Sequence, residues 1–258
     1  MINSISSASE SRPKSFNDMI GQDAIVKTLN NAIKNDNIPQ ALLFCGPRGV
    51  GKTSCARILA KTINNLEDDF EYNIFELDAA SNNSVEDIRN ITDQIRIPPQ
   101  TGRYKVYIID EVHMLSNQAF NAFLKSLEEP PEHVVFILAT TEKNKILPTI
   151  LSRCQIYDFK KVDNESIIKL LSKICKEKKV KYEDGSLSLI AERSDGSIRD
   201  SLSIFDRLVS FTDSNLTISE VTLNLNVLDF NTYFKISELI NKKDIPGILN
   251  LYNEVYIK

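Results

Sequence analysis

The chain has 258 residues, of which 42% are hydrophobic and 26% charged, with a formal net charge of −4 at pH 7. This length allows one large domain or two ordinary ones, and the composition excludes wholesale disorder, collagen and low-complexity fibres. The acidic balance excludes a wholly basic nucleic-acid binder but leaves room for a local DNA-contacting face. No apolar run reaches the roughly 18 residues that span a bilayer, and the polar N-terminus has no secretory signal pattern. We therefore expect a cytoplasmic protein without membrane contacts.

Short apolar runs alternate with amphipathic stretches through the first two-thirds of the chain. The apolar runs predict buried strands at residues 41–45, 74–78, 105–110, 134–140 and 155–159. Amphipathic spacing predicts helices at 52–64, 84–95 and 118–127. Strands separated by helices predict an α/β fold with a parallel sheet and helices on both faces.

After residue 160 the pattern becomes helical, with helices predicted at 163–178, 185–193, 199–211, 233–240 and 245–256. We expect three parts: an α/β domain over 1–160, a small all-helical domain over 161–226, and a third helical part over 227–258. Two helices make a poor core on their own. The third part is therefore expected to be incomplete or to need a partner.

A phosphate-binding pattern lies between the first predicted strand and helix. Residues 46–53 match G-x-x-x-x-G-K-[ST], in which glycines let backbone N–H groups surround phosphate oxygens. Lys52 is expected to reach the β- and γ-phosphates, and the Thr53 hydroxyl to ligate Mg²⁺. A glycine-rich turn that binds nothing is the alternative, and the flanking strand and helix disfavour it. The expected nucleotide-binding residues are Gly46, Pro47, Arg48, Gly49, Val50, Gly51, Lys52, Thr53 and Ser54.

Two carboxylates, Asp110 and Glu111, end the third predicted strand. Asp110 is expected to hold Mg²⁺, and Glu111 to polarise the attacking water as a general base. A solvated strand end would be an equally good interpretation of this segment alone, but it is a poor one beside a phosphate loop. The chain has no N-K-x-D guanine-reading motif, which favours ATP over GTP.

The sequence indicates no metal site other than the one for Mg²⁺. The histidines, His113 and His133, are expected to pack or to form hydrogen bonds. The four cysteines are expected to be buried neutral thiols, because none has the C-x-x-C spacing of zinc sites: Cys45, Cys55, Cys154 and Cys175.

Longer motifs carry a family resemblance. D-E-V-H-M-L-S at 110–116, L-E-E-P-P-E-H-V at 127–134, L-A-T-T-E at 138–142 and L-P-T-I-L-S-R-C at 147–154 follow one another in the chain. They resemble the AAA+ ATPases of the bacterial clamp loader, the gamma/tau family of DNA polymerase III. The resemblance runs from about residue 12 to the end of the chain and implies an AAA+ domain, a helical lid and a helical collar.

The resemblance implies roles for five further residues. Thr141 matches sensor 1, where a hydroxyl contacts the γ-phosphate or the lytic water. Arg153 matches the arginine finger that reaches the ATP of a neighbouring subunit in trans. Arg199 matches sensor 2 on the lid, and Arg12 and Pro13 resemble the segment that lies along the adenine.

Each of the three motif residues also has a simpler interpretation when taken alone. Thr141 is a common kind of residue at a strand end. Arg153 is equally compatible with a surface arginine paired with a nearby acid, and Arg199 with a local pair to Asp195 or Asp200.

Three features depart from the family pattern. Residues 61–73 contain no cysteine, where most members carry a four-cysteine zinc module, so we expect no zinc. Ser11 stands where the family usually has an aromatic residue, which weakens the expected adenine contact. The collar is expected to be truncated after two helices, at 227–258.

The resemblance implies an ATPase motor that loads a sliding clamp onto primed DNA within the DNA polymerase III holoenzyme. The implied partners are other loader subunits in a hetero-oligomeric ring, the sliding clamp, primer–template DNA bound without sequence preference, and the replicative polymerase. No carboxylate set beyond the ATPase pair supports nucleotide addition, so we expect no polymerase site in this chain.

Two other functions stay open at this point. A stator subunit would bind nucleotide without hydrolysing it, but stators tend to lose the residues that are intact here. Another AAA+ remodeller, such as a branch-migration motor, is disfavoured by the Ser152-Arg153-Cys154 triplet. A basic segment at 98–104, with Lys105 beside it, is a candidate DNA contact or a solvated loop, and the helix at 117–127 is a candidate clamp contact.

Overall fold

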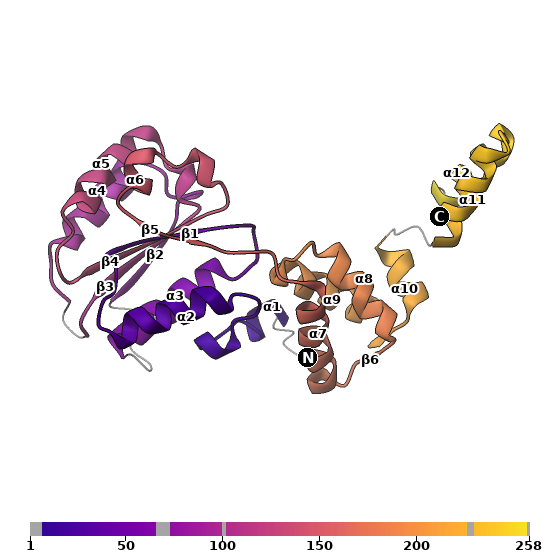
Figure 1. Ribbon diagram of the computed structural model, residues 1–258, viewed down its shortest axis with the longest axis horizontal. Helices are drawn as coiled ribbons and strands as arrows, with labels where there is room; N and C mark the ends of the chain where they lie inside the picture. Colours follow the sequence, from indigo (N-terminus) through magenta and orange to yellow (C-terminus); the bar gives the residue numbers. More distant parts are fainter. Residues whose placement is uncertain (1–6, 66–72, 100–101, 226–229, 257–258) are drawn as a thin grey trace.

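The computed structural model of the chain describes residues 7–65, 73–99, 102–225 and 230–256. Within these residues, one five-stranded parallel sheet has the spatial order β2-β3-β4-β1-β5 (Figure 1). This confirms the predicted parallel α/β fold. The strands are β1 Ala41–Cys45, β2 Ile74–Asp78, β3 Lys105–Asp110, β4 Val134–Thr140 and β5 Gln155–Asp158.

The central strands are buried on both faces, and their side chains alternate between two separate cores. In β1, Leu42 and Phe44 enter one core, whereas Leu43 and Cys45 enter the other. The period of two is the pleat of a strand, and it explains why these segments are continuous apolar runs with no polar face.

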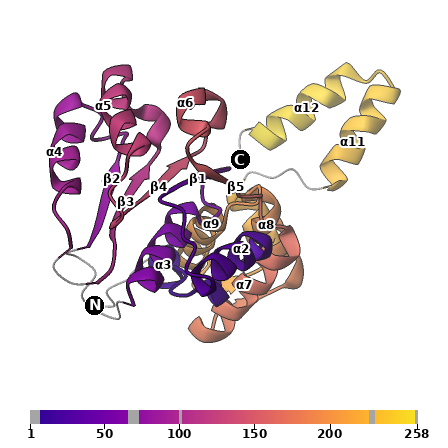
Figure 2. The ribbon, with the colours of Figure 1, turned by 60° about the vertical axis from the view of Figure 1, so that its left-hand side comes forward.

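Helices cover each face of the sheet, as Figures 1 and 2 show. One face carries α2 (Asp23–Lys34) and α3 (Lys52–Asn64), whose buried side chains join Leu42 and Phe44. The other carries α4 (Val85–Ile95), α5 (Asn117–Glu128) and α6 (Pro148–Leu151). The start of α5 is capped by Ser116, whose hydroxyl accepts the Ala119 N–H at 3.2 Å.

A second group of helices follows β5 and has its own hydrophobic core, which is built around Ile167, Leu171, Ile190 and Phe205. Asp163, Ser197 and Thr217 cap three of these helices with side-chain oxygens. We call this group the helical lobe. Its elements are α7 Asn164–Lys178, β6 Lys181–Tyr182, α8 Asp184–Arg193, α9 Ile198–Phe211, β7 Asn215–Leu216 and α10 Ile218–Asn224.

The last two described helices, α11 (Phe230–Asn241) and α12 (Ile245–Tyr256), pack against each other as a hairpin. Figures 1 and 2 both show this hairpin apart from the helical lobe. Several of its large apolar side chains are exposed: Phe234, Ile240, Ile245, Leu249 and Tyr252. Among the helices described in the chain, none combines the length and apolar character needed to cross a membrane.

Most predicted elements are confirmed to within three residues at either end. Helix α2 was not predicted, although Ile25, Leu29 and Ile33 have the four-residue spacing of a buried helical stripe. Nor did the sequence pattern predict α6, α10, or the parallel pair β6 and β7 inside the otherwise helical lobe. These pieces are two to seven residues long, too short for a periodic signal.

The core of the helical lobe can be tested with two phenylalanines on α9. Phe205 is fully buried and Phe211 is 60% exposed. We expect Phe205→Ala to lower the free energy of unfolding by about 3–5 kcal/mol, because the substitution leaves a cavity in the core. The matched control Phe211→Ala should change it by less than about 0.5 kcal/mol. Chemical denaturation followed by circular dichroism measures both, and equal effects would contradict the assignment of this core.

Candidate active site

The carboxyl ends of three adjacent strands meet at one edge of the sheet. Strand β4 lies between β3 and β1, with Leu138 paired to Ile109 and Thr140 paired to Cys45. The loop after β1, the carboxylates after β3 and the hydroxyls after β4 therefore converge. This edge is the usual ligand position in open parallel sheets.

The phosphate loop connects β1 to α3. It needs glycine at two positions where another segment of the chain packs closely against its backbone. Gly46 has φ 147° and Gly49 has φ 74°, and both lie in the region that favours glycine. A Cβ at Gly46 would overlap the carbonyl oxygen of Phe159, and a Cβ at Gly49 would overlap the Ser197 hydroxyl. The loop is thus packed between the chain that leaves β5 and the start of α9.

Lys52, the first residue of α3, is buried with its ammonium group inside this loop. Its Nζ donates hydrogen bonds to the carbonyl oxygens of Gly46 and Pro47, each at 2.8 Å. Burial lowers the pKa of Lys52, whereas the nearby carboxylates of Glu111 and Asp110 act in the opposite direction. A cation is therefore held where the loop and the helix N-terminus favour an anion.

Thr53 and Asp110 form an oxygen-rich pair across the site. The Thr53 hydroxyl donates to Asp110 Oδ2 at 2.6 Å, and the other carboxylate oxygen of Asp110 accepts the N–H of Glu111 at 3.0 Å. A hydroxyl and a carboxylate are ligands that Mg²⁺ accepts, and that ion completes its shell with water and phosphate oxygens. The two residues therefore fit a Mg²⁺–nucleotide complex without further protein ligands.

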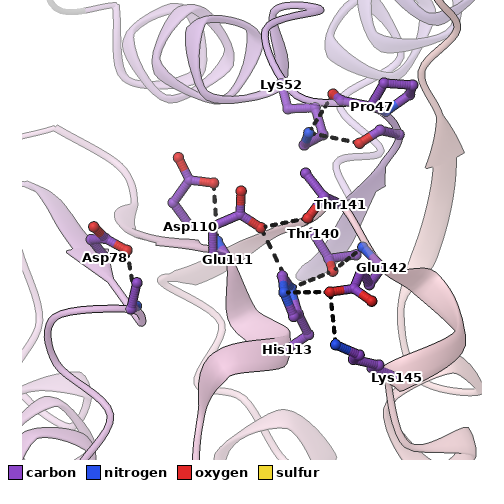
Figure 3. A network of polar contacts seen from close by, with 12 residues as sticks. Pro47, Lys52, Asp78, Asp110, Glu111, His113, Thr140, Thr141, Glu142 and Lys145 are labelled. Carbon is purple, nitrogen blue, oxygen red and sulfur yellow. Dashed lines mark hydrogen bonds and ion pairs between the residues drawn. The ribbon is translucent and has the colours of Figure 1, made fainter.

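Glu111 has a left-handed backbone, with φ 48° and ψ 43°. Such a conformation costs a residue with a side chain about 1–2 kcal/mol. The turn continues into the short 3₁₀ helix η2 (Val112–Met114). The Glu111 carboxylate faces β4, where Oε2 accepts the Thr141 hydroxyl at 3.0 Å (Figure 3).

A cleft of about 690 Å³ opens beside these groups, a size that suits a nucleotide-sized ligand. Arg12 and Pro13 line it, as do Lys52, Thr53 and Arg199. Burial lowers the pKa of Arg12, and the charges of Arg57 and Arg199 lower it further. Ser11, which stands in place of the family's aromatic residue, also lines the cleft.

The sequence analysis missed one wall of this cleft. Lys169 and Lys173, one helical turn apart on α7, line it together with Ser166. Their four-residue spacing on a predicted helix was the available signal, but only the fold shows that this face of α7 turns toward the phosphate loop.

The start of α9 contacts the phosphate loop directly. The N–H groups of Ile198 and Arg199 both donate to the Gly49 carbonyl, at 3.0 and 3.3 Å. The local pair of Arg199 with Asp195 or Asp200, the simpler interpretation, is not found among the described ion pairs. Asp195 instead pairs with Lys161 at 2.6 Å.

Arg153 lies outside the cleft. It follows α6, where its guanidinium pairs with Glu128 at 2.9 Å and donates to the Thr149 carbonyl at 2.6 Å. Within this chain Arg153 is therefore a surface arginine paired with an acid. The fold does not bring it to the phosphate loop of its own chain.

The next predictions concern the cysteines and zinc. The four cysteines are buried, and burial raises the pKa of Cys55 to about 12 and of Cys45 to about 11. Residues 66–72 of the cysteine-free segment at 61–73 lie outside the described residues. In the described part of the chain, no group of three or more His, Cys, Asp and Glu side chains is placed to hold a metal ion. The absence of zinc stays a prediction.

Two basic residues of the candidate DNA-contacting segment at 98–105 make contacts within the chain, and residues 100 and 101 of it lie outside the described residues. Arg103 pairs with Asp36, and Lys105 is buried with its Nζ donating to the Gln94 carbonyl at 3.2 Å. Lys105 was therefore wrongly included among candidate DNA contacts, because its ammonium group faces a carbonyl oxygen inside the protein.

The arrangement of strands, phosphate loop and helical lobe is that of an AAA+ P-loop fold. Solved structures of RuvB from Thermotoga maritima share it. The Holliday junction branch migration motor has a TM-score of 0.66 at 21% identity, covering 89% of this chain and 79% of that chain. A structure of the same motor with a single substitution has a TM-score of 0.68 at 22% identity, covering 89% and 79%. At this identity the likeness shows the fold alone.

Sequence relatives define the family more narrowly. The chain is 42% identical to DNA polymerase III subunit tau of Bacillus subtilis (strain 168), over 95% of this chain and 46% of that protein. It is 40% identical to the tau subunit of Escherichia coli (strain K12), over 94% and 40%. It is 39% identical to the gamma subunit of Buchnera aphidicola subsp. Baizongia pistaciae, over 92% and 69%.

Two family descriptions match along the chain. Residues 21–74 and 71–163 match "DNA polymerase III, delta subunit", and residues 166–214 match "DNA polymerase III clamp loader subunit, ATPase lid domain". The chain belongs to the DNA polymerase III gamma/tau family. It spans less than half the length of the first two relatives, 46% and 40%.

The contact between the phosphate loop and α9 can be tested at Gly49. We expect Gly49→Ala to weaken it, because a left-handed alanine costs about 1–2 kcal/mol and its Cβ overlaps Ser197. Hydrogen exchange at the first amides of α9 should become about tenfold faster. The double variant Gly49→Ala/Ser197→Gly, which removes the overlapping hydroxyl, should recover part of the protection. Unchanged exchange in Gly49→Ala would contradict this contact.

Proposed function

We propose that this chain is an ATPase motor subunit of the bacterial clamp loader. One observation carries the proposal: Lys52, the Thr53–Asp110 pair and the Glu111–Thr141 pair converge at one strand edge, beside a cleft of nucleotide size. Membership of the gamma/tau family supplies the context, and the intact set of groups favours hydrolysis over binding alone.

In this proposal residues 46–54 bind the phosphates of ATP through backbone N–H groups, and Lys52 exchanges its two carbonyl partners for phosphate oxygens. Arg12 and Pro13 lie against the base. Thr53 and Asp110 hold Mg²⁺, which neutralises charge on the phosphates when it is bound. No zinc takes part.

Glu111 is the proposed general base. A carboxylate with an ordered hydroxyl neighbour orients the attacking water and accepts its proton. Thr141 is the proposed sensor, since its hydroxyl sits on Glu111 Oε2 at 3.0 Å and lies at the end of the strand beside the phosphate loop. Together they couple the position of the base to the γ-phosphate.

We propose that residues 1–160 form the AAA+ domain and 161–226 the lid. Two backbone hydrogen bonds already join the lid to Gly49, and Arg199 lines the cleft on the same side. A γ-phosphate that attracts Arg199 would pull α9 toward the loop. Nucleotide state would in this way set the angle between the domains.

Arg153 is the proposed arginine finger for the ATP of a neighbouring subunit. Its position outside its own cleft and its partial exposure suit a residue that acts in trans. The pair with Glu128 would have to exchange for phosphate oxygens on assembly. A cation there stabilises charge in the transition state of phosphoryl transfer.

Residues 227–258 are proposed as the start of a collar that assembles the ring. The exposed apolar side chains of α11 and α12 support this proposal, because a two-helix hairpin gains stability by burying such a face. The proposed partners are the other loader subunits, the sliding clamp, primer–template DNA contacted through phosphates, and the replicative polymerase. We propose no polymerase site for this chain, and the proposed compartment is the bacterial cytoplasm.

The alternative is a stator that binds nucleotide without turnover. Ser11, which lines the cleft where the family usually has an aromatic residue, favours it to some degree, because it weakens the expected contact with the base. A branch-migration motor shares the fold, but relatives at about 40% identity belong to the clamp-loader family instead.

The first test is ATP turnover with Mg²⁺, measured with the clamp, the loader partners and primed DNA. Lys52→Ala should lose nucleotide affinity as well as turnover, because it removes the cation of the phosphate loop. Glu111→Gln should keep its affinity for a fluorescent ATP analogue while turnover falls at least about 100-fold. Turnover of Glu111→Gln at the unsubstituted rate would refute the proposed base.

A second test asks whether Arg153 acts on the ATP of a neighbouring subunit. Arg153→Ala should lower stimulated turnover by about 10³-fold in a mixed assembly, whereas its own nucleotide affinity should not change. Glu128→Gln is the matched control: it removes the partner charge but keeps the finger, and stimulated turnover should persist. A chain with nucleotide affinity but no stimulated turnover to lose would be a stator.

A further inference from the structure

A buried histidine joins the Glu111 carboxylate to the segment that follows β4. His113 lies in the middle of η2, and only 6% of its side chain is exposed. Figure 3 shows its ring between Glu111 on one side and Glu142 on the other, with Thr140 beside it. The roles proposed above leave this residue unused.

Each ring nitrogen of His113 has an oxygen partner. Nδ1 is hydrogen-bonded to Thr140 Oγ1 at 3.0 Å and lies 3.4 Å from Glu111 Oε2. Nε2 lies 3.4 Å from Glu142 Oε1. The ring is therefore held at both edges, and its rotation about the Cβ–Cγ bond is restricted.

The partners of His113 are themselves anchored. The Thr140 hydroxyl accepts the N–H of Glu142 at 3.0 Å, which ties it to the backbone of the next turn. Glu142 accepts a hydrogen bond from Lys145 Nζ at 2.8 Å. That bond lowers the pKa of Glu142, whose carboxylate also lies beside the imidazole.

The contacts on Glu111 fall on a single oxygen. Oε2 meets both the Thr141 hydroxyl, at 3.0 Å, and His113 Nδ1, at 3.4 Å. Two groups that contact one oxygen from different elements restrict its position more than one group would, and the left-handed backbone of Glu111 does not by itself restrict the side chain to this orientation.

We infer that His113 is a positioning residue for Glu111, itself held by Thr140 and Glu142. The inference rests on the proposed function, in which Glu111 is the base. It extends that function by linking the base to the segment from Glu142 to α6, which continues to Arg153. A displacement of this segment would reach the carboxylate through the imidazole ring.

Three substitutions at His113 separate positioning from packing. Asparagine can place its amide near the position of Nδ1, glutamine can place its amide near Nε2, and alanine retains neither. We expect kcat of His113→Ala to fall about tenfold at unchanged KM for ATP, because Glu111 Oε2 loses one of the two groups that contact it. His113→Asn should recover most of kcat, and His113→Gln should not, because the Glu111 contact is on the Nδ1 side.

These kinetic constants are measured on the full chain assembled with its loader partners and the clamp. The kcat values of Glu111→Gln and of the double variant Glu111→Gln/His113→Ala are measured in the same way. If His113 acts through Glu111, adding His113→Ala to Glu111→Gln should cause no further loss. The control is His133→Ala, which removes the other histidine, a residue hydrogen-bonded to the Ile95 carbonyl at 3.0 Å. It should leave kcat unchanged.

The outcomes are distinguishable. If Glu111→Gln turns over normally, the base assigned in the proposed function is refuted, and the positioning role is refuted with it. If Glu111→Gln is impaired but His113→Ala is not, the proposed function stands and the positioning role is refuted. Equal losses in His113→Asn and His113→Ala, with a lowered melting temperature, would show a packing role and overturn the inference. Additive losses in the double variant would overturn it as well.

Discussion

The parallel backbone pairing of β3, β4 and β1 is the constraint on which the site depends. Because β4 separates the other two strands, residues that are distant in sequence end at one edge. The first N–H of the phosphate loop, at Gly46, donates to the Thr140 carbonyl at 3.2 Å and extends this pairing past the strands. A slip of one residue would turn the apolar side chains of a strand to the opposite face. Two separate apolar cores oppose such a slip, so they also hold this edge of the sheet in register.

The phosphate loop serves two packing partners at once. Gly46 allows the chain leaving β5 to pass, and Gly49 allows the helical lobe to approach. The same backbone that is suited to phosphate therefore carries hydrogen bonds to α9. The helical lobe, which has its own core, is therefore joined to the phosphate loop by hydrogen bonds as well as by the chain that follows β5.

Structural similarity shows the architecture of this chain, whereas sequence similarity shows its family. The AAA+ arrangement is shared with RuvB structures at 20–22% identity, which supports an architecture but no substrate. Relatives near 40% identity narrow the family to gamma/tau. The groups with a proposed partner-dependent role are Arg153 and the α11–α12 hairpin, and neither contributes a residue to the lining of the cleft. A division of this kind is expected where one chain contributes its surface to the site of the next.

The sequence by itself determined the phosphate loop, the carboxylate pair and nearly all long elements, because these depend on local spacing: G-x-x-x-x-G-K-[ST], a strand ending in Asp110 and Glu111, and apolar periods of two or about 3.6. It also held the family's motifs. Only the tertiary structure decided that Arg153 pairs with Glu128, that Lys105 is buried, and that α7 lines the cleft. It alone placed His113 between Glu111 and Glu142. Contacts of this kind join side chains from different strands and turns, and no spacing along the chain encodes the distances that separate them in space.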